Sequence, residues 1–331
     1  MSSDRERPMK VRINVAQDGP FGESVSDAQV QQIQAVSEDM DVVVAATPEE
    51  REAHLPDTEV VLGRFNREVF EKAPHLKLVM VEGAGVDALL FNEFVNSDVV
   101  LVSSKGTVGT HLADHAWALL LGLLRGIGRS VREADWGIRQ SIRDESWELG
   151  GKTLGIVGLG GTGTEVAKRG ALGFDMDVIA IDPEDIPKPS FVNEVWKPDR
   201  FHDMLERSDA VAVCAPLTVE TRGMFNLEAF QHMRRHVILV NVTRGPIIDE
   251  PSLLQALEEG LIGAVGLDVS PVEPLPLEHP LWTMKNVIIT PHASGGPPLR
   301  IGRWVDIVCE NLRRYLDGRP LLSVIDKVKG Y

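Results

Sequence analysis

The chain has 331 residues, of which 43% are hydrophobic and 25% charged, a composition typical of a folded globular protein and not of a disordered or fibrous one. Its length favours two domains, because single hydrophobic cores stop growing at roughly 250–300 residues. The formal charge of −15 disfavours nucleic acid as a partner, since an acidic surface repels phosphate backbones. The acidity is typical of an ordinary acidic protein, with adaptation to a salty habitat as the alternative.

The number of cysteines and the first ten residues indicate the cellular compartment of the protein. Cys214 and Cys309 are too few for a disulfide framework or a cysteine metal cluster, and they indicate a reducing compartment. Segment 1–10 is charged and has no apolar signal core, and the longest apolar run, 116–124, is far shorter than the roughly 20 residues of a membrane span. We therefore expect a cytoplasmic protein that binds no metal, no membrane and no nucleic acid.

Short β-branched apolar runs alternate with helical segments in the first third of the chain. Buried parallel strands are expected at 11–16, 41–46, 59–64, 76–83 and 99–104. Helix-like segments such as 27–38 lie between them. A long helical pattern from about His111 to Asp135 is expected to connect two domains, and a loop carrying Trp136 and Trp147 follows it.

A second β–α series begins at Lys152. Its strands are expected at 153–160, 176–182, 210–216, 236–242, 264–270 and 286–292. A terminal helix is expected at 304–318, with Gly318 as its stop. The alternation predicts an α/β protein with two doubly wound parallel sheets, one domain spanning 106–295 and the other formed by 1–105 and 296–331.

A glycine-rich turn opens this second series. The segment GLGGTG (158–163) follows a predicted strand and precedes a helix, which is the context that the G-x-G-x-x-G pattern requires. The glycines allow a tight turn and a close approach of the backbone to a pyrophosphate, and the helix N-terminus offers N–H groups to the phosphates. The alternative is a glycine-rich turn without a ligand. The cofactor-binding residues predicted here are Gly158, Gly160, Gly161, Thr162 and Gly163.

Asp182 ends the next predicted strand, 19 residues after Gly163. A carboxylate at this place can bind a ribose 2′-hydroxyl and would repel a 2′-phosphate. No arginine follows it to receive such a phosphate, since the next residues are Pro183, Glu184 and Asp185. We therefore predict NAD as the cofactor in preference to NADP, with a simple strand-end cap as the alternative for Asp182.

Five further segments resemble motifs of the D-2-hydroxyacid dehydrogenase family, in the family's order and over nearly the whole chain. They are GAGVD (83–87), SDAVAVCAPLTVETRGMFN (208–226), VNVTRGPIIDEPSLLQAL (240–257), GLDVSPVEP (266–274) and NVIITPHASGG (286–296). The resemblance implies an NAD(H)-dependent enzyme that interconverts a small D-2-hydroxy acid and its 2-keto acid, of the glyoxylate, hydroxypyruvate or phosphoglycerate class. It also implies a Rossmann-type NAD-binding domain and a flavodoxin-like substrate-binding domain.

Arg244 is the predicted substrate anchor. It follows a predicted strand at the carboxyl end, where open α/β sheets bind ligands. Its guanidinium can bind a carboxylate through two hydrogen bonds and polarise the adjacent carbonyl. The alternative from the residue alone is a surface arginine paired with Glu250, and the resemblance of the segment around it favours the catalytic role.

His292 and Glu273 are the predicted proton-transfer pair. Histidine suits proton transfer near neutral pH, and a nearby carboxylate fixes its tautomer and favours the charged ring. The resemblance implies that this imidazolium protonates the substrate carbonyl during reduction and recovers the proton during oxidation. A structural histidine and a solvated loop glutamate are the alternatives.

The resemblance assigns the remaining site residues. Asp268 is expected to face the nicotinamide carboxamide, with a turn-forming aspartate as the alternative. Backbone N–H groups of Ala84 and Gly85 are expected to bind the substrate carboxylate, although Gly85 can be a turn glycine alone. Further cofactor contacts are expected at Pro216, Thr221, Val242 and Thr243.

One segment departs from the family's pattern. After Gly296 the family commonly has a small polar residue, whereas this chain has Pro297-Pro298-Leu299-Arg300, which leaves one wall of the substrate pocket undefined. Arg300 and Arg303 can reach a second acidic group of a substrate, with a solvated helix face as the favoured alternative. The resemblance also implies a homodimer through the NAD-binding domains, with the segment 136–147 reaching across.

Three other functions share these motifs. Formate dehydrogenases pair the histidine with glutamine, which Glu273 disfavours, and phosphite dehydrogenases have a lysine where this chain has Ala84. NAD(H)-responsive transcriptional corepressors keep the arginine, glutamate and histidine, but their disordered tails have no counterpart here. The lack of a regulatory extension beyond Tyr331 likewise disfavours a serine-pathway phosphoglycerate dehydrogenase.

Overall fold

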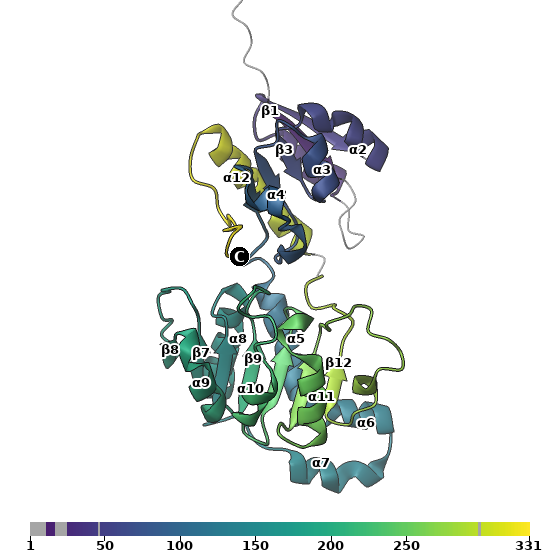
Figure 1. Ribbon diagram of the computed structural model, residues 1–331, viewed down its shortest axis with the longest axis vertical. Coiled ribbons are helices and arrows are strands. Elements are labelled where there is room, and N and C mark those ends of the chain that lie inside the picture. Colours follow the sequence, from purple (N-terminus) through teal and green to yellow (C-terminus); the bar gives the residue numbers. More distant parts are fainter. Residues whose placement is uncertain (1–10, 17–24, 46, 297–298) are drawn as a thin grey trace, which may run out of the picture. The chain divides into compact units, whose positions relative to one another are not determined.

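The computed structural model of the protein describes residues 11–16, 25–45, 47–296 and 299–331 (Figure 1). The chain divides into two compact units. The first unit consists of Met1–Thr107 and Gly296–Tyr331, and the second of Val108–Gly295. The sequence places the first division after residue 105, and in the structure it follows Thr107.

The first unit contains a sheet of five parallel strands in the order β2-β1-β3-β4-β5. The strands are β1 (Val11–Ala16), β2 (Met40–Ala45), β3 (Val60–Leu62), β4 (Leu78–Met80) and β5 (Val100–Val102). The helices are α1 (Asp27–Gln34), α2 (Pro48–His54), α3 (Arg67–Lys72), α4 (Asn92–Val95) and α12 (Leu299–Leu316). The strand order is that of flavodoxin-like doubly wound folds, so the predicted fold class is confirmed for this unit.

Helix α12 brings the C-terminal part of the chain into the core of the first unit. Its buried positions recur at helical spacing, and they pack on side chains of the first sheet such as Ile13 and Leu78. They are Ile301, Trp304, Val305, Val308, Cys309 and Leu312. The helix begins five residues before the predicted start, and Gly318 follows it with φ of 66°.

The second unit contains seven parallel strands in the order β8-β7-β6-β9-β10-β11-β12. They are β6 (Thr153–Val157), β7 (Asp177–Ile181), β8 (Glu194–Trp196), β9 (Ala210–Val213), β10 (Ile238–Asn241), β11 (Ala264–Leu267) and β12 (Val287–Ile289). This is the Rossmann order, in which the first strand lies centrally and the chain builds outward on both sides, and it confirms the predicted class. The edge strand β8 was not predicted.

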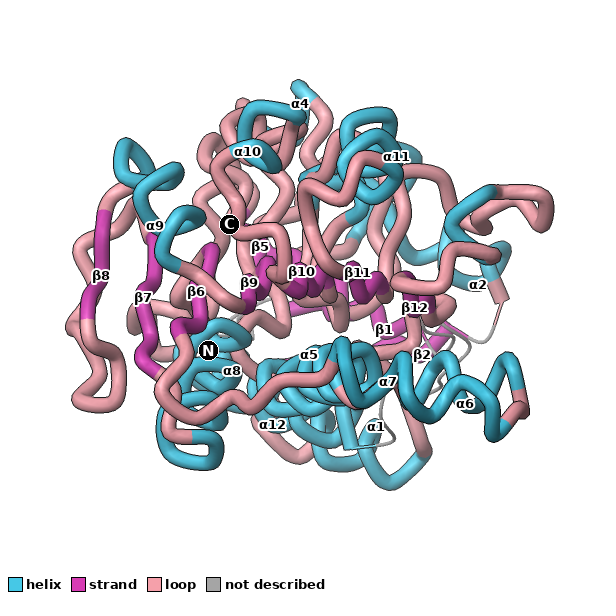
Figure 2. The backbone as a smooth tube through the Cα atoms, turned by 90° about the horizontal axis from the view of Figure 1, so that it is seen from below, coloured by secondary structure: helices cyan, strands magenta, loops and turns pink. Residues whose placement is uncertain are grey.

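Helices cover both faces of the second sheet, as Figure 2 shows. On one face lie α9 (Phe201–Arg207), α10 (Leu227–Gln231) and α11 (Glu250–Glu258). On the other lie α5 (Gly109–Leu124) and α8 (Gly161–Phe174), which pack against each other. Each face buries a separate hydrophobic core, as expected for nearly continuous apolar strands. No helix in the described part of the chain is long and apolar enough to cross a membrane.

The predicted long helix at 111–135 is wrong, because the structure has two helices there. α5 ends at Leu124, and α6 (Ile127–Glu133) begins after Gly126, whose φ is 63°. A Cβ at Gly126 would lie 2.8 Å from side-chain carbons of Ile142, so glycine satisfies both the backbone and the packing. The segment expected to be a loop contains a 3₁₀ turn at Trp136–Ile138 and helix α7 (Arg139–Glu145).

Strand register brings the turns of the second unit together at one edge. Val157, the last residue of β6, pairs with Val213 of β9 and Ile181 of β7. The order of the chain reverses between β6 and β9, and ligands of doubly wound sheets bind at such a reversal, beyond the carboxyl ends of the strands. The loops after these strands therefore define where a site is expected.

Candidate active site

The glycine-rich turn leaves β6 in a conformation that side chains would obstruct. Gly158 has φ of 89°, and a Cβ there would lie 2.8 Å from the backbone of Ala215. A Cβ at Gly163 would overlap the carbonyl oxygen of Gly158. Around Gly160, in contrast, a Cβ would meet nothing within 4 Å, which leaves room for a phosphate. Gly161 begins helix α8, and the first turn of a helix has backbone N–H groups without partners inside the helix, which can bind an anion.

A second helix start supports the same turn. α5 begins at Gly109, where a Cβ would lie 2.7 Å from the carbonyl oxygen of Gly161. This residue was not predicted, because the helix was expected to begin at His111. The available signal was a glycine just before the predicted helix, since glycine weakens a helix unless close packing requires it.

Asp182 lies directly after β7, beside the glycine turn. Its Oδ2 accepts the backbone N–H of Leu159 at 2.8 Å, and its Oδ1 accepts that of Glu184 at 2.9 Å. The side chain is buried, so the carboxylate holds the turn as well as closing the strand. Its contact with a ribose stays a prediction.

The loop after β9 is held by Thr221. The Thr221 hydroxyl donates to the carbonyl oxygen of Pro216 at 2.7 Å and accepts the N–H of Thr218 at 2.8 Å. These bonds close the loop next to the glycine turn, because β9 is the direct neighbour of β6. The structure thus gives Thr221 a structural role, and its contact with a cofactor stays a prediction.

Arg244 follows β10 in a turn that the buried Asn241 organises. The Oδ1 atom of Asn241 accepts the N–H of Thr243 at 3.1 Å, and its Nδ2 donates to the carbonyl oxygen of Arg244 at 2.9 Å. The half-buried Arg244 donates from Nη1 to the carbonyl oxygen of Thr243 at 2.9 Å. Val242 is buried and Thr243 half-buried in the same turn.

Gly245 brings this turn against the loop that follows β11. A Cβ at Gly245 would overlap the backbone carbonyl of Ser270, so only glycine permits the approach. The loop it contacts carries Glu273, whose Oε1 accepts the N–H of Ser270 at 3.0 Å. The structure therefore brings the Arg244 segment next to the Glu273 segment. Asn241 and Gly245 flank Arg244 in the sequence, yet neither was singled out.

His292 and Glu273 contact each other directly. Nδ1 of His292 lies 2.7 Å from Oε2 of Glu273. The side chains are 37% and 39% exposed, so the pair is open to solvent and to a ligand. With the glutamate on Nδ1, the other ring nitrogen, Nε2, is left for proton transfer.

A buried carboxylate holds the loop that carries His292. Asp268, at the end of β11, accepts the backbone N–H of Ala293 on Oδ1 at 3.0 Å and that of Ser294 on Oδ2 at 2.9 Å. The hydroxyl of Thr290 also donates to Oδ1 at 2.6 Å. These contacts wrap the loop around one side chain and stabilise the φ of 51° at His292.

His115, on α5, completes this network. Its Nε2 lies 2.7 Å from the hydroxyl oxygen of Thr290 and 3.3 Å from Oδ1 of Asp268. Burial alone would raise the pKa of the Asp268 carboxyl, but the hydrogen bonds outweigh burial and hold that pKa well below its usual value. Asp268 is therefore a charged anchor, and its predicted approach to a carboxamide stays a prediction. His115 and Thr290 were missed, because they join Asp268 only through the fold.

The remaining predicted residues lie in the first unit. Ala84 and Gly85 stand in the loop after β4, Ala84 half-buried and Gly85 exposed. The favoured expectation of a solvated helix face is wrong for Arg300, which is buried at the start of α12. Arg303 is half-buried and donates from Nη1 to the carbonyl oxygen of Thr107 at 2.9 Å. Pro297 and Pro298 lie outside the described residues.

The chain is similar in sequence to known proteins of one family. The family model "D-isomer specific 2-hydroxyacid dehydrogenase, NAD binding domain" matches residues 117–294. A glyoxylate reductase of Korarchaeum cryptofilum is 36% identical over 261 residues, which are 77% of each chain. A D-3-phosphoglycerate dehydrogenase of Methanocaldococcus jannaschii is 33% identical over 293 residues, and the match spans 87% of this chain but only 55% of that longer protein.

A solved structure shows the same fold. It is a D-isomer specific 2-hydroxyacid dehydrogenase from Xanthobacter autotrophicus Py2 in complex with NADPH and MES, with a TM-score of 0.78 and 29% identity. The similarity covers 96% of this chain and 99% of that one. The chain belongs to the family of D-isomer-specific 2-hydroxyacid dehydrogenases, as its motifs predicted. It is an NAD-dependent oxidoreductase that acts on the CH–OH group of 2-hydroxy acids and on the corresponding 2-keto acids.

The anchoring role of Asp268 can be tested with Asp268→Asn. At neutral pH we expect a loss of roughly 1.5–3 kcal/mol in the free energy of unfolding, the range for a hydrogen bond to a charged group. Because the folded protein lowers the pKa of Asp268, this stabilisation is complete above the unfolded value of about 3.9 and is lost as pH falls through the folded value. The gap between wild type and variant should therefore narrow as pH falls below about 4.

Urea denaturation at about pH 7, 5 and 3.5 measures this gap. Asp199→Asn, at an exposed aspartate of the same unit, is the control and should change stability by less than about 0.5 kcal/mol. A gap for Asp268→Asn that is absent at pH 7, or that widens on acidification, would contradict the assignment.

Proposed function

We propose that the enzyme uses NADH to reduce hydroxypyruvate or a similarly small 2-keto acid to the D-2-hydroxy acid, and glyoxylate to the achiral glycolate. The observation that carries the proposal is the 2.7 Å contact between His292 and Glu273 beyond the ends of β11 and β12. A glutamate on Nδ1 fixes the tautomer and the orientation of the ring and leaves Nε2 for proton transfer, as reduction of a carbonyl requires. The glyoxylate reductase among the relatives supports the choice of substrate class.

Arg244 is proposed to bind the substrate carboxylate. Its turn is fixed by Asn241 and by the close approach at Gly245, so the guanidinium extends from a rigid support. Two parallel N–H groups of a guanidinium match the two oxygens of a carboxylate. We propose the backbone N–H groups of Ala84 and Gly85, in the first unit, as further donors to the same group.

The proton step is assigned to His292. When bound, the nicotinamide supplies a hydride to the keto carbon. The carbonyl oxygen gains negative charge in this step, and Nε2–H of His292 donates a proton to it. Glu273 holds Nδ1 throughout and keeps the ring oriented, and in the oxidation direction Nε2 takes the proton back.

Variants of this pair test the function. His292→Ala should lower kcat for glyoxylate or hydroxypyruvate reduction by roughly 10²–10⁴-fold, because it removes the general acid. Glu273→Gln should cost less, and the double variant should be little worse than His292→Ala, since groups that act as one unit are not additive. Steady-state rates measure the losses in kcat. Fluorescence titrations measure the affinity for NADH, which should change little in all three variants.

The same assay separates an enzyme from an NAD(H)-responsive binding module. Tight NADH binding without reduction of any 2-keto acid by the wild-type protein would identify a module. Strictly additive losses in the double variant would instead show that the two side chains do not act together. His279→Ala is the control, because this histidine of the same unit contacts Glu250 and not Glu273.

A preference for NADH over NADPH is proposed from Asp182. Its carboxylate lies at the end of β7 against the glycine turn, where a 2′-phosphate would bring a second negative charge. Asp182→Ala should therefore weaken the binding of NADH and remove the repulsion of NADPH. The ratio of kcat/KM for NADH to that for NADPH should fall. Equal kcat/KM values for the two cofactors in the wild-type enzyme would overturn the assignment. The two cofactors must be compared directly, because a structurally similar dehydrogenase was solved in complex with NADPH.

We also propose a homodimer through the NAD-binding units. Segment 127–145 exposes large apolar side chains, with Trp136 89% exposed and Val131 77% exposed. The same segment borders a hollow of about 700 Å³ in the second unit, which Trp147 also lines. Apolar side chains exposed together beside a hollow indicate a protein interface.

Trp136→Glu should dissociate this dimer, because it places a charge in the apolar contact. Sedimentation velocity should give twice the mass of the chain for the wild type and the monomer mass for the variant. Val219→Glu, at an exposed apolar residue outside this segment, is the control and should stay dimeric. A monomeric wild type would contradict the proposal.

The two free cysteines support a location in the reducing cytoplasm.

A further inference from the structure

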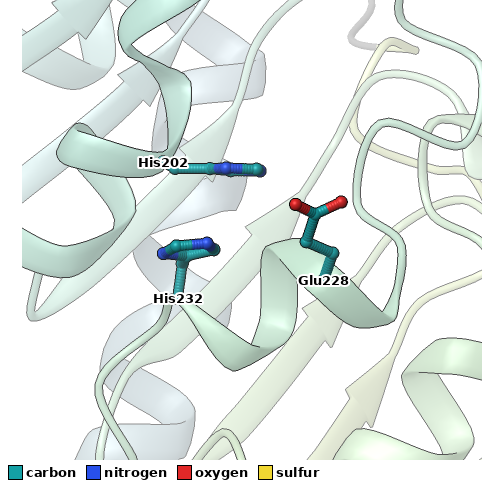
Figure 3. Close-up of side chains that lie close together, drawn as sticks. All are labelled: His202, Glu228 and His232. Carbon is teal, nitrogen blue, oxygen red and sulfur yellow. The ribbon is translucent and has the colours of Figure 1, made fainter.

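Two histidines and a glutamate gather on α9 and at the end of α10, among residues to which the proposed reaction assigns no role. His202 lies on α9, while Glu228 lies on α10 and His232 ends it. One ring nitrogen of each histidine and one carboxylate oxygen of Glu228 all lie within 4.8 Å of one another. Figure 3 shows the two imidazole rings one above the other, with the carboxylate beside them.

The backbone that carries these side chains is fixed by the core of the unit. Phe201 and Met204 of α9 and Phe230 beside His232 are buried in one cluster, and Phe201 packs edge-to-face on Phe225 at 5.2 Å. The imidazole rings of His202 and His232 stack within 13° of parallel, with centroids 4.2 Å apart. The lone pairs of their nitrogens therefore lie in parallel planes, and one ring must rotate about its Cβ–Cγ bond before both can point at one ion. The core thus fixes the backbone that carries the two histidines, whereas Glu228 reaches them with an exposed side chain.

A second observation points to a metal ion. Nδ1 of His232 lies 2.7 Å from Oε1 of Glu206. A carboxylate on Nδ1 keeps the proton there and leaves the lone pair on Nε2. Histidines that bind a metal almost always donate their other ring N–H to a carboxylate, a backbone carbonyl or water. Glu206 is itself placed by the next turn, since Arg234 donates from Nε to its backbone carbonyl at 3.0 Å.

We propose that His202, His232 and Glu228 bind one divalent transition-metal ion, with Zn²⁺ as the best fit. Two imidazoles and one carboxylate suit Zn²⁺, Co²⁺, Ni²⁺ or Cu²⁺, whereas Mg²⁺ and Ca²⁺ prefer oxygen ligands throughout. Bonds of about 2.1 Å in a tetrahedral site place ligand atoms roughly 3.4 Å apart, so the cluster must contract by about an ångström. The exposed Glu228 side chain can supply much of that movement, and water can take the fourth position.

The ion would join α9 to α10, two short helices on one face of the sheet. Its role is therefore structural and does not depend on hydride transfer. No metal site was predicted from the sequence, because the ligands are 26 and 4 residues apart along the chain and come from two helices. The pairs His202/Glu206 and Glu228/His232 share an i, i+4 spacing, which places each pair on one side of its helix and was the available signal.

Zinc titration of the full chain, without a histidine tag and after treatment with a chelator, tests the proposal. A chromophoric chelator in competition should report one Zn²⁺ per chain, and Mg²⁺ should not compete. Glu206→Gln should weaken binding roughly 10–100-fold, as loss of such a supporting carboxylate does. His202→Ala and His232→Ala should weaken it further.

Two controls keep the result decisive. His75→Ala, at an exposed histidine of the first unit, should bind Zn²⁺ as the wild type does. Co²⁺ bound to the unmutated protein should show the intense visible absorption of a four-coordinate site, which does not require any variant to fold. His202→Ala should keep its turnover of 2-keto acid. Absence of stoichiometric Zn²⁺ binding, or equal affinity in wild type and His202→Ala, would overturn the proposal.

Discussion

A single buried carboxylate, that of Asp268, determines the shape of the candidate active site. Three donors from the loop 290–294 converge on its two oxygens, and His115 of α5 closes the network from the other side. An ionised group without exposed surface is tolerated only when its lone pairs are filled. The loop must therefore keep the one conformation that fills them, and this conformation carries His292 toward Glu273.

The parallel sheet explains why these groups meet. Each strand of the second unit ends at the same edge, so residues far apart in the chain become neighbours there. Arg244 follows β10, Glu273 follows β11 and His292 follows β12, and these three strands are adjacent in the sheet. The glycine turn follows β6. Strand β9 lies between β6 and β10 in the sheet and ends at the same edge. Close backbone approaches at Gly158 and Gly245 then set the loops against one another.

Features that depend on residues close together in the sequence were predictable. The glycine turn, Asp182 and the strand-ending residues Arg244 and His292 each stand in a recognisable local pattern, and both doubly wound sheets follow from the alternation of strands and helices. The break at Gly126 was missed, because the helical periodicity continues across it. The short strand β8 was missed because its three residues carry no clear alternation.

Features that depend on tertiary contact were not predictable. Nothing near His115 in the sequence indicates that it meets Thr290, 175 residues later. Arg300 is buried at the start of α12, whose apolar side packs on the sheet of the first unit, and a helix pattern alone does not specify that burial. His202 and Glu206 likewise meet Glu228 and His232 only because the fold sets two short helices side by side.

The stereochemistry of reduction tests the central claim most directly. Hydroxypyruvate reduced with NADH carrying deuterium at the transferred position of C4 should yield D-glycerate with deuterium on C2, because hydride and proton reach the carbonyl in one fixed arrangement. Chiral chromatography with mass spectrometry measures the configuration and the deuterium content of the glycerate. L-glycerate, a racemic product, or no NADH oxidation with any small 2-keto acid would contradict the account.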